Sequence, residues 1–423
     1  MRIMLGTLAL GTAFAAPLWA AEAAPDRSAV VGTYADIAAA GYQDSAAAAK
    51  ALQVAVRALI DAPSADRMQA ARAAWLSSRV PYQQTEVFRF GNPIVDDWEG
   101  KVNSWPLDEG MIDYVDPTYG GATDENPLAV LNVIANPKLL IGGEEVDASV
   151  ITPDLLENKL QEAGAIDTNV ATGYHAIEFL LWGQDLNGTG PGAGNRPWTD
   201  YAQGAACSHG NCDRRAAYLA AATELLVGDL DWMAEQWAAG GAAREAVTGD
   251  PTAGLTALFT GMGSLTYGEQ AGERMRLGLM LNDPEEEQDC FSDNTVNSHY
   301  YDQIGVRNVY LGHYVGIDGR VVEGPSPSAL VAAADPAVDR ALRAALETSI
   351  MRLGELKLVS ESGLHYDQML AADNPVGGAV IQRGVDALVA QTAEIERAVA
   401  ALALDKIAFE GSDSLDNPEA VFQ

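Results

Sequence analysis

His175 and Glu178 are the side chains of this chain whose types and spacing most clearly point to chemistry. They lie in the stretch Gly173–Trp182, which is apolar on almost every side of a helix, a pattern typical of a buried helix. Residues three apart on a helix project from the same face. Because an unpaired buried imidazole or carboxylate is costly, we predict that the pair binds a cation. Without a metal, the same spacing fits a buried histidine hydrogen-bonded to Glu178 or to a main-chain carbonyl.

Two ligands hold a metal poorly, and the segment around Pro81 offers a third. Four of its residues are spaced at i, i+4, i+7 and i+11, namely Trp75, Arg79, Tyr82 and Glu86. They share one face if the helix continues through the bend that Pro81 imposes. We expect Glu86 to be the third ligand, with Arg79 and Tyr82 as donors that orient the carboxylates. The alternative is that Arg79 and Glu86 lie on a solvated face.

Helices must position these residues, because helical periodicity dominates the chain and alternating β-branched runs are few. Asp44 or Ser45 is suited to cap a first helix that ends before Pro63, and Ser64 a second that bends at Pro81. Further helices are predicted over 168–182, 214–238, 252–280, 336–359 and 376–403. The sequence therefore predicts an all-α protein of long, packed helices.

Long irregular stretches are expected at 91–125, 183–212 and 283–328. Stretches of this length tend to be functional when they are ordered. The first contains Trp105 and Asp108, which we interpret as candidate cleft residues, although they fit equally well as side chains that pin the loop onto the helices.

A weak internal repeat divides the chain. Val102–Asp108 resembles Val296–Asp302, and Gly173–Glu178 resembles Gly363–Gln368, in the same order and at similar offsets. We infer a duplicated unit, with an N-terminal helical-bundle half over 24–245 and a C-terminal half over 246–423. The second copy has Gln368 in place of the carboxylate, so we expect one intact site per chain. His299 would approach the same cleft if the halves pack face to face.

Residues 1–23 resemble a cleavable signal peptide, with a basic start, an apolar core and small residues before Pro25. No later run is long enough to span a membrane, so we expect an exported protein of the periplasm or cell envelope. The formal net charge of −33 argues against binding to nucleic acid or to anionic lipid surfaces. Solubility is the simplest meaning of this charge.

Three cysteines occur in this exported chain. Cys207 and Cys212 would close a small loop as a disulfide, which leaves Cys290 unpaired. Three pairings are possible, and the sequence does not choose between them. A zinc site that uses His209 is the alternative for this loop.

Several motifs together resemble the imelysin family, in its branch similar to iron-regulated protein A. They are Gly173-x-His175-x-x-Glu178 with the following 179–186, the segments 75–86 and 88–91, and the segment 287–295. The resemblance implies an exported, all-helical protein of two related bundles with a link to iron uptake. It also implies that Gly173, His175 and Glu178 are functional residues, and the family carries a history as metallopeptidases.

Two functions follow as hypotheses. The first is a metal-binding protein that serves iron acquisition, with iron or zinc as its divalent or ferric cation and other iron-uptake components as possible partners. The second is a zinc-type metallopeptidase, but Ala176 stands where a His-Glu-x-x-His enzyme has its general base. An interaction module that grips a peptide or polysaccharide is a third class that the aromatic loops permit.

Overall fold

Long helices form almost all of the computed structural model, which describes residues 24–422. The longest, α1 (Arg27–Asp61), begins after Asp26, whose side chain accepts a hydrogen bond from the backbone N–H of Ser28. This bond satisfies one of the free amides at the helix N-terminus. The predicted all-α class is confirmed, while the predicted signal peptide lies outside the described residues.

The first helix starts earlier than the predicted cap at Asp44 or Ser45. Both residues are buried within α1. The Ser45 hydroxyl donates to the Gly41 carbonyl one turn earlier at 2.9 Å, and the Asp44 carboxylate accepts from the Tyr314 hydroxyl at 2.7 Å. The prediction was wrong because neither side chain caps a helix terminus: Ser45 bonds within α1, and Asp44 accepts from a distant tyrosine.

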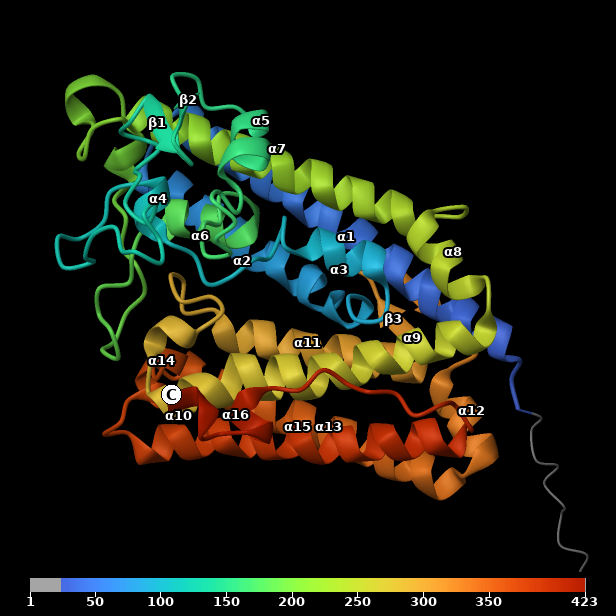
Figure 1. Cartoon of the computed structure of the whole chain (residues 1–423). Coiled ribbons are helices and arrows are strands. Elements are labelled where there is room, and N and C mark those ends of the chain that lie inside the picture. Colours follow the sequence, from blue (N-terminus) through green and yellow to red (C-terminus); the bar gives the residue numbers. More distant parts are fainter. Residues whose placement is uncertain (1–23, 423) are drawn as a thin grey trace, which may run out of the picture.

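Helices from the two parts of the chain form two layers (Figure 1). The upper layer contains α1, α2 (Ala65–Gln83), α6 (Gly173–Trp182), α7 (Cys212–Trp237) and α8 (Ala242–Thr248). The lower layer contains α9 (Pro251–Ser264), the π-helix Leu265–Leu277 that continues it, α10 (Gly278–Leu281), α11 (Thr295–Leu311), α12 (Pro327–Ala334), α13 (Pro336–Glu361), α14 (Tyr366–Leu370) and α15 (Pro375–Ala401). Short helices at α3 (Pro93–Glu99), α4 (Glu109–Ile112), α5 (Pro153–Leu155) and α16 (Asp413–Asp416) lie within the connections.

Two small antiparallel hairpins interrupt the helices. In one, β1 (Lys138–Ile141) pairs with β2 (Glu144–Asp147), and in the other, β3 (His313–Val315) pairs with β4 (Val321–Glu323). Neither forms a layer of the fold. Across the described range, no helix is both long and apolar enough to cross a bilayer.

The helix α11 was missed, because the sequence placed residues 283–328 in an irregular stretch. Its buried side chains include Ser298, His299, Asp302 and Gln303. A helix that buries polar residues shows no apolar stripe, so the periodicity that predicts helices is absent. Within the lower layer, α11 packs against α13 and also against α2 of the upper layer.

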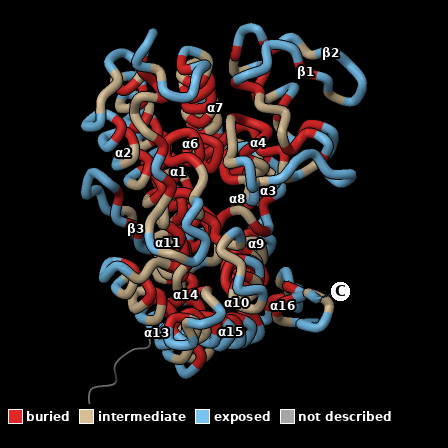
Figure 2. The backbone as a smooth tube through the Cα atoms, turned by 90° about the vertical axis from the view of Figure 1, so that its left-hand side faces the viewer, coloured by how far each residue is buried: buried red, intermediate tan, exposed pale blue. Residues whose placement is uncertain are grey.

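One large hydrophobic core runs through both layers, from Val30 to Leu404. A smaller cluster fills the space between the π-helix, α13, α14 and α15. Figure 2 shows the buried backbone along the middle of the molecule and the exposed segments at its rim. The proposed halves therefore share a core.

The internal repeat does not extend to local structure at its first motif pair. Val296–Asp302 lies in α11, whereas Val102–Asp108 forms turns and extended chain. In the second pair, the Gln368 side chain accepts from the backbone N–H of His365 at 3.0 Å and so caps α14. The duplication and the boundary at 245 stay predictions.

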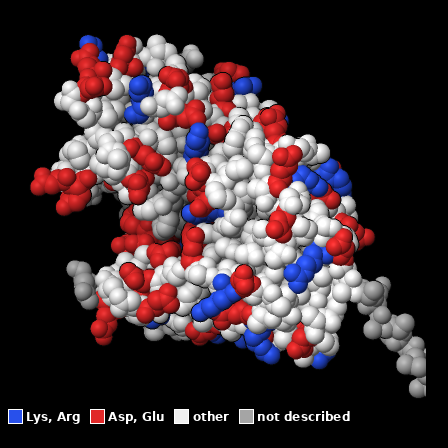
Figure 3. All heavy atoms as spheres, turned by 45° about the vertical axis from the view of Figure 1, so that its right-hand side comes forward, with Lys and Arg blue, Asp and Glu red and all other residues white. Residues whose placement is uncertain are grey.

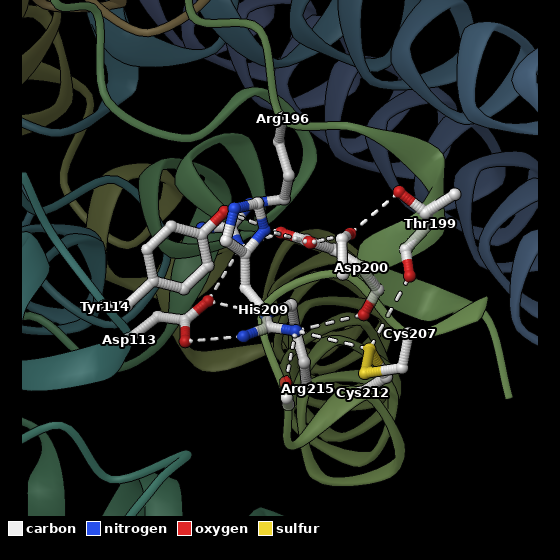
Figure 4. The surroundings of a disulfide bond; sticks show 11 residues. Asp113, Tyr114, Arg196, Thr199, Asp200, Cys207, His209, Cys212 and Arg215 are labelled. Atoms are coloured by element: carbon white, nitrogen blue, oxygen red, sulfur yellow. Dashed lines mark hydrogen bonds and ion pairs between the residues drawn. A yellow bond between two sulfur atoms is a disulfide. The ribbon is translucent and has the colours of Figure 1, made fainter. Parts of the chain in front are cut away.

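A disulfide joins Cys207 and Cys212 (Figure 4). Cys290 is a free thiol. His209 lies in the same loop, and its Nδ1 is 2.5 Å from Oδ1 of Asp200. The sulfur atoms are bonded to each other and are not thiolate ligands, so the structure favours the disulfide over the zinc alternative.

We expect Gly173→Ala to destabilise the protein because Gly173 begins α6 with a φ of +79° and lies against the main chain of Val102. A Cβ there would lie 2.5 Å from the Val102 carbonyl oxygen. Gly363→Ala is the matched control, because Gly363 has a φ of +97° and open space around it. Chemical denaturation should show a loss of about 1–2 kcal/mol at Gly363 and a larger loss at Gly173. Equal losses would contradict the role of the Val102 contact.

Candidate metal centre

The helix α6 places His175 and Glu178 side by side inside the protein. Every residue of α6 is buried, and the two side chains have no exposed surface. Nδ1 of His175 lies 2.9 Å from Oε2 of Glu178. The i, i+3 spacing therefore produces the close imidazole–carboxylate pair that the sequence predicted.

The second carboxylate at this place is Asp289, which the sequence did not single out. It lies in the connection between α10 and α11, with its Oδ1 3.8 Å from Nδ1 of His175. One donor atom from each of His175, Glu178 and Asp289 lies within 4.8 Å of the other two. Among residues 24–422, this is the only such group of three. The available signal was the segment 287–295, which was noted for its resemblance but not for a ligand.

The structure places Glu86 elsewhere, which corrects the predicted ligand set. Helix α2 ends at Gln83, and Glu86 begins a separate short 3-10 helix. Because the helix does not continue, the i+11 spacing no longer places Glu86 on the face of Trp75 and Arg79. Oε2 of Glu86 instead pairs with Nη2 of Arg274 at 2.7 Å.

Arg79 contacts the Asp289 carboxylate directly. Its Nη2 donates to Oδ1 of Asp289 at 2.9 Å, and its Nη1 donates to Oδ1 of Asn103 at 2.6 Å. The guanidinium lies over the rings of Trp75, Tyr82 and Tyr174, with centroid distances of 5.6, 5.6 and 4.9 Å. Arg79 thus orients Asp289, while Tyr82 contributes a ring face.

The loop 289–294 and the start of α11 hold both carboxylates in place. Glu178 Oε1 accepts from the backbone N–H and the hydroxyl of Ser292 at 3.0 and 2.6 Å. Asp289 Oδ2 accepts from Nδ2 of Asn294 at 2.8 Å and from the Ser298 hydroxyl. One short segment therefore provides a carboxylate and also positions the carboxylate of α6.

Burial sets the protonation states of the three groups. Burial and the nearby Arg79 lower the pKa of His175 to about 3, so the imidazole is neutral. Burial and the adjacent Asp289 raise the pKa of Glu178 well above its usual range. Burial opposes ionisation of Asp289 too, but Arg79 and the hydrogen bonds from Ser298 and Asn294 lower its pKa.

This donor set fits a cation. A neutral imidazole has one lone-pair nitrogen, and Nδ1 of His175 faces both carboxylates. Nε2 of His175 has no hydrogen-bond partner among residues 24–422. When Nε2 carries the ring proton, the lone pair of Nδ1 points at carboxylate oxygens. Either a proton on Glu178 or a metal ion must then lie between them.

Three other predicted site residues lie outside this group. The Asp108 carboxylate accepts from the Thr168 hydroxyl at 2.7 Å and from the Tyr119 hydroxyl at 3.1 Å, so it ties down its own loop. Trp105 lines a separate cavity of about 380 Å³. His299 is buried on α11 beside Tyr366, with ring centroids 5.4 Å apart. Neither Asp108 nor His299 belongs to the group of candidate donor atoms formed by His175, Glu178 and Asp289.

Comparison with known proteins shows to which family this chain belongs. The sequence profile of imelysin matches residues 38–395. The chain belongs to the imelysin family. It is also 37% identical over 67 residues to iron-regulated protein A of Synechococcus elongatus, an alignment that covers 16% of this chain and only 19% of that relative.

Solved structures share the imelysin-like fold. A protein described as an iron-regulated protein A precursor from Parabacteroides distasonis superposes with a TM-score of 0.64 and 18% identity, over 90% of this chain and 97% of that one. An imelysin-like protein from Psychrobacter arcticum gives a TM-score of 0.55 and 17% identity, over 92% of this chain and 100% of that one. At these identities the likeness establishes the fold alone.

We expect the stability of this imelysin-family protein to fall as the pH drops from 6.5, partly because of His299. Burial and the nearby Arg274 lower the pKa of His299 to about 3. Between pH 6.5 and 3 the unfolded chain binds a proton at this residue and the folded protein does not. The stability that the protein has with a neutral His299 is therefore fully present above pH 6.5. It is lost as the pH falls toward 3, by about 1.4 kcal/mol per pH unit at most.

Replacing His299 by Phe should flatten this dependence, measured as the free energy of unfolding in urea from pH 7.5 to 4. His313→Phe, at a residue whose side chain is 47% exposed, controls for the substitution itself. An unchanged slope in the His299 variant would contradict the role of this residue.

Proposed function

We propose that this protein binds one metal ion at His175, Glu178 and Asp289 and serves iron acquisition. The observation that carries the proposal is that an imidazole and two carboxylates, all without exposed surface, lie within 4.8 Å of one another. Such a group is costly to bury unless something positive neutralises it. The likeness to iron-regulated protein A of Synechococcus elongatus supports the link to iron.

The donor chemistry narrows the choice of cation. One imidazole nitrogen and two carboxylate oxygens suit iron or zinc, whereas a site for magnesium or calcium is built from oxygen donors alone. Arg79, Ser292, Asn294 and Ser298 hold the carboxylates in fixed orientations, as outer-shell partners of metal ligands do. The same four residues line an adjoining cavity of about 360 Å³.

We further propose that the mature protein works in the periplasm or cell envelope with other components of iron uptake. The basic and apolar start of the chain supports export, and the Parabacteroides distasonis relative is described as a precursor.

The metallopeptidase alternative is less well supported. A catalytic metal keeps a coordination position open to substrate, yet His175 and Glu178 have no exposed surface and Asp289 none either. The cavity beside them is lined by their hydrogen-bond partners and not by the ligand residues. We therefore favour metal binding over peptide cleavage.

Metal titration of the chelator-treated protein tests the proposed ligand set. We expect the wild type to bind one Zn²⁺ or Fe²⁺ per chain, measured by calorimetry and elemental analysis. His175→Ala and Asp289→Asn should each weaken binding by at least about tenfold, because each removes a donor atom.

Glu86→Gln is the matched control, because Glu86 is a buried carboxylate that pairs with Arg274 instead. It should retain the metal, and circular dichroism should show that all variants are folded. Equal metal content in the wild type and in a His175→Ala/Glu178→Ala double variant would overturn the site. Loss of metal in the Glu86 variant, with retention in Asp289→Asn, would overturn the choice of third ligand.

A further inference from the structure

The first two of the long irregular stretches meet around a cavity that the candidate metal centre does not use. Residues from 114–117, 182–187 and 193–197 form its wall together with His209. Its volume is about 450 Å³, within the roughly 300–1,000 Å³ of typical ligand pockets. None of the three proposed metal ligands lines it. Because long stretches that are ordered tend to be functional, this cavity is a candidate site for a separate ligand.

One buried side chain of this wall has a hydrogen-bond donor without a partner. The side chain of Arg196 is 1% exposed, and its Nη1 donates to the carboxylates of Asp113 at 2.7 Å and Asp200 at 3.1 Å. Its Nε has no hydrogen-bond partner among residues 24–422. Buried polar groups in folded proteins are nearly always hydrogen-bonded. An acceptor atom of a ligand would therefore satisfy the Nε–H of Arg196.

Asp200 fixes the ring of His209, a second polar residue of the wall (Figure 4). Its carboxylate accepts from the Tyr114 and Ser208 hydroxyls at 2.6 and 2.8 Å, and its Oδ1 lies 2.5 Å from Nδ1 of His209. Burial opposes ionisation of Asp200, but these hydrogen bonds and Arg196 lower its pKa. In the neutral ring of His209, Nδ1 therefore carries the proton, and the lone pair of Nε2 is left for a ligand.

The disulfide and an aromatic contact hold His209 in this position. Cys207 and Cys212 close a short loop around it. The imidazole stacks on the ring of Tyr114, with centroids 4.6 Å apart and ring planes inclined by 27°. A side chain that is held in place beforehand loses less conformational freedom when a ligand binds. This part of the wall is therefore preorganised.

The rest of the wall combines apolar surface with an unused amide. Asn195 is exposed at the cavity, and its side chain is able both to donate and to accept a hydrogen bond. The apolar residues of the wall are Val115, Pro117, Trp182, Leu186, Ala193 and Pro197. Apolar surface with a few fixed polar groups is typical of sites for small organic molecules.

The charge of the protein favours an uncharged ligand. Asp113 and Asp200 already pair with the two buried arginines at this place, Arg196 and Arg215. Figure 3 shows Asp and Glu side chains gathered in the hollow between the two layers, with few Lys or Arg among them, and the formal net charge of the chain is −33. Such a field repels anions. A cation fits no better, because the guanidinium of Arg196 forms part of the wall.

We propose that this cavity binds an uncharged mono- or disaccharide, a function separate from the metal binding proposed above. A hydroxyl group both accepts and donates, so neighbouring sugar hydroxyls satisfy the Nε–H of Arg196 and the lone pair of Nε2 of His209. A further hydroxyl bonds to the amide of Asn195. The C–H faces of the sugar pack on the apolar part of the wall, where their burial stabilises the complex.

Titration of the purified protein with uncharged disaccharides tests the proposal. The probes are cellobiose, maltose and N,N′-diacetylchitobiose, and binding is measured by calorimetry and by saturation-transfer NMR. We expect at least one probe to bind. His209→Phe should weaken its binding about three- to tenfold, because the phenyl ring keeps the contact with Tyr114 but has no nitrogen acceptor. Asn195→Ala, at an exposed position, should have an effect of similar size.

His313→Phe is the matched control, because the side chain of His313 is 47% exposed, against 46% for His209, and does not line the cavity. It should bind the disaccharide within about twofold of the wild type. Asp289→Asn should bind it as the wild type does, because Asp289 lies outside the cavity. Failure of the metal site would therefore leave the saccharide result unchanged.

Competition between glucose and glucuronate tests the preference for an uncharged ligand, because the two sugars differ by one carboxylate. We expect glucose to displace the bound disaccharide at a lower concentration than glucuronate does. The proposal is overturned if no disaccharide binds, or if glucuronate is the better competitor. It is also overturned if His209→Phe binds the disaccharide as tightly as His313→Phe.

Discussion

The ion pair between Arg79 and Asp289 is the contact on which the candidate metal centre depends. Arg79 comes from α2 in the upper layer, and Asp289 comes from the loop before α11. Both side chains are buried, so removing either partner would leave a charge in the protein interior, which typically costs about 3–5 kcal/mol. The pair keeps Asp289 ionised and holds it beside His175. The Arg79–Asp289 ion pair therefore has two effects: it joins the two layers, and it keeps a negative charge at the site.

A second buried pair across the same boundary, Arg274 with Glu86, has a different consequence. Arg274 lies on the π-helix and also contacts Asp302 at 3.2 Å, so its charge is shared between carboxylates of both layers. Glu86 is thereby neutralised and unavailable as a ligand. The interior thus divides its acidic groups into those paired with arginine and those that lack a cationic side chain. Glu178 belongs to the second kind, because its carboxylate contacts His175 and Ser292 and no arginine.

The loop 287–294 contacts several elements, including α2 through Asp289 and α6 through Ser292. The Phe291 carbonyl accepts from the backbone N–H of Gly194 at 2.9 Å, and Ser292 bonds to Glu178 on α6. Three cavities adjoin the loop. The segment is therefore anchored at these polar points and also by Phe291, which packs in the hydrophobic core against Phe179 of α6.

The sequence by itself determined the helical class, the helices with clear apolar periodicity and the His175–Glu178 pair, because i, i+3 geometry and 3.6-residue periodicity are local properties. It also indicated the disulfide between Cys207 and Cys212, whose partners are five residues apart. Only the tertiary structure decided that Asp289, and not Glu86, stands beside His175. Glu86 leaves the face of α2 because the helix ends at Gln83, and it pairs with Arg274. Asp289 pairs with Arg79 instead. Both ion pairs join residues that are far apart in the sequence, with separations of 188 and 210 positions, and such contacts leave no periodic pattern. For the same reason the sequence did not predict α11. Its buried polar residues bond to groups outside the helix, as Ser298 does to Asp289 and Asp302 to Arg274.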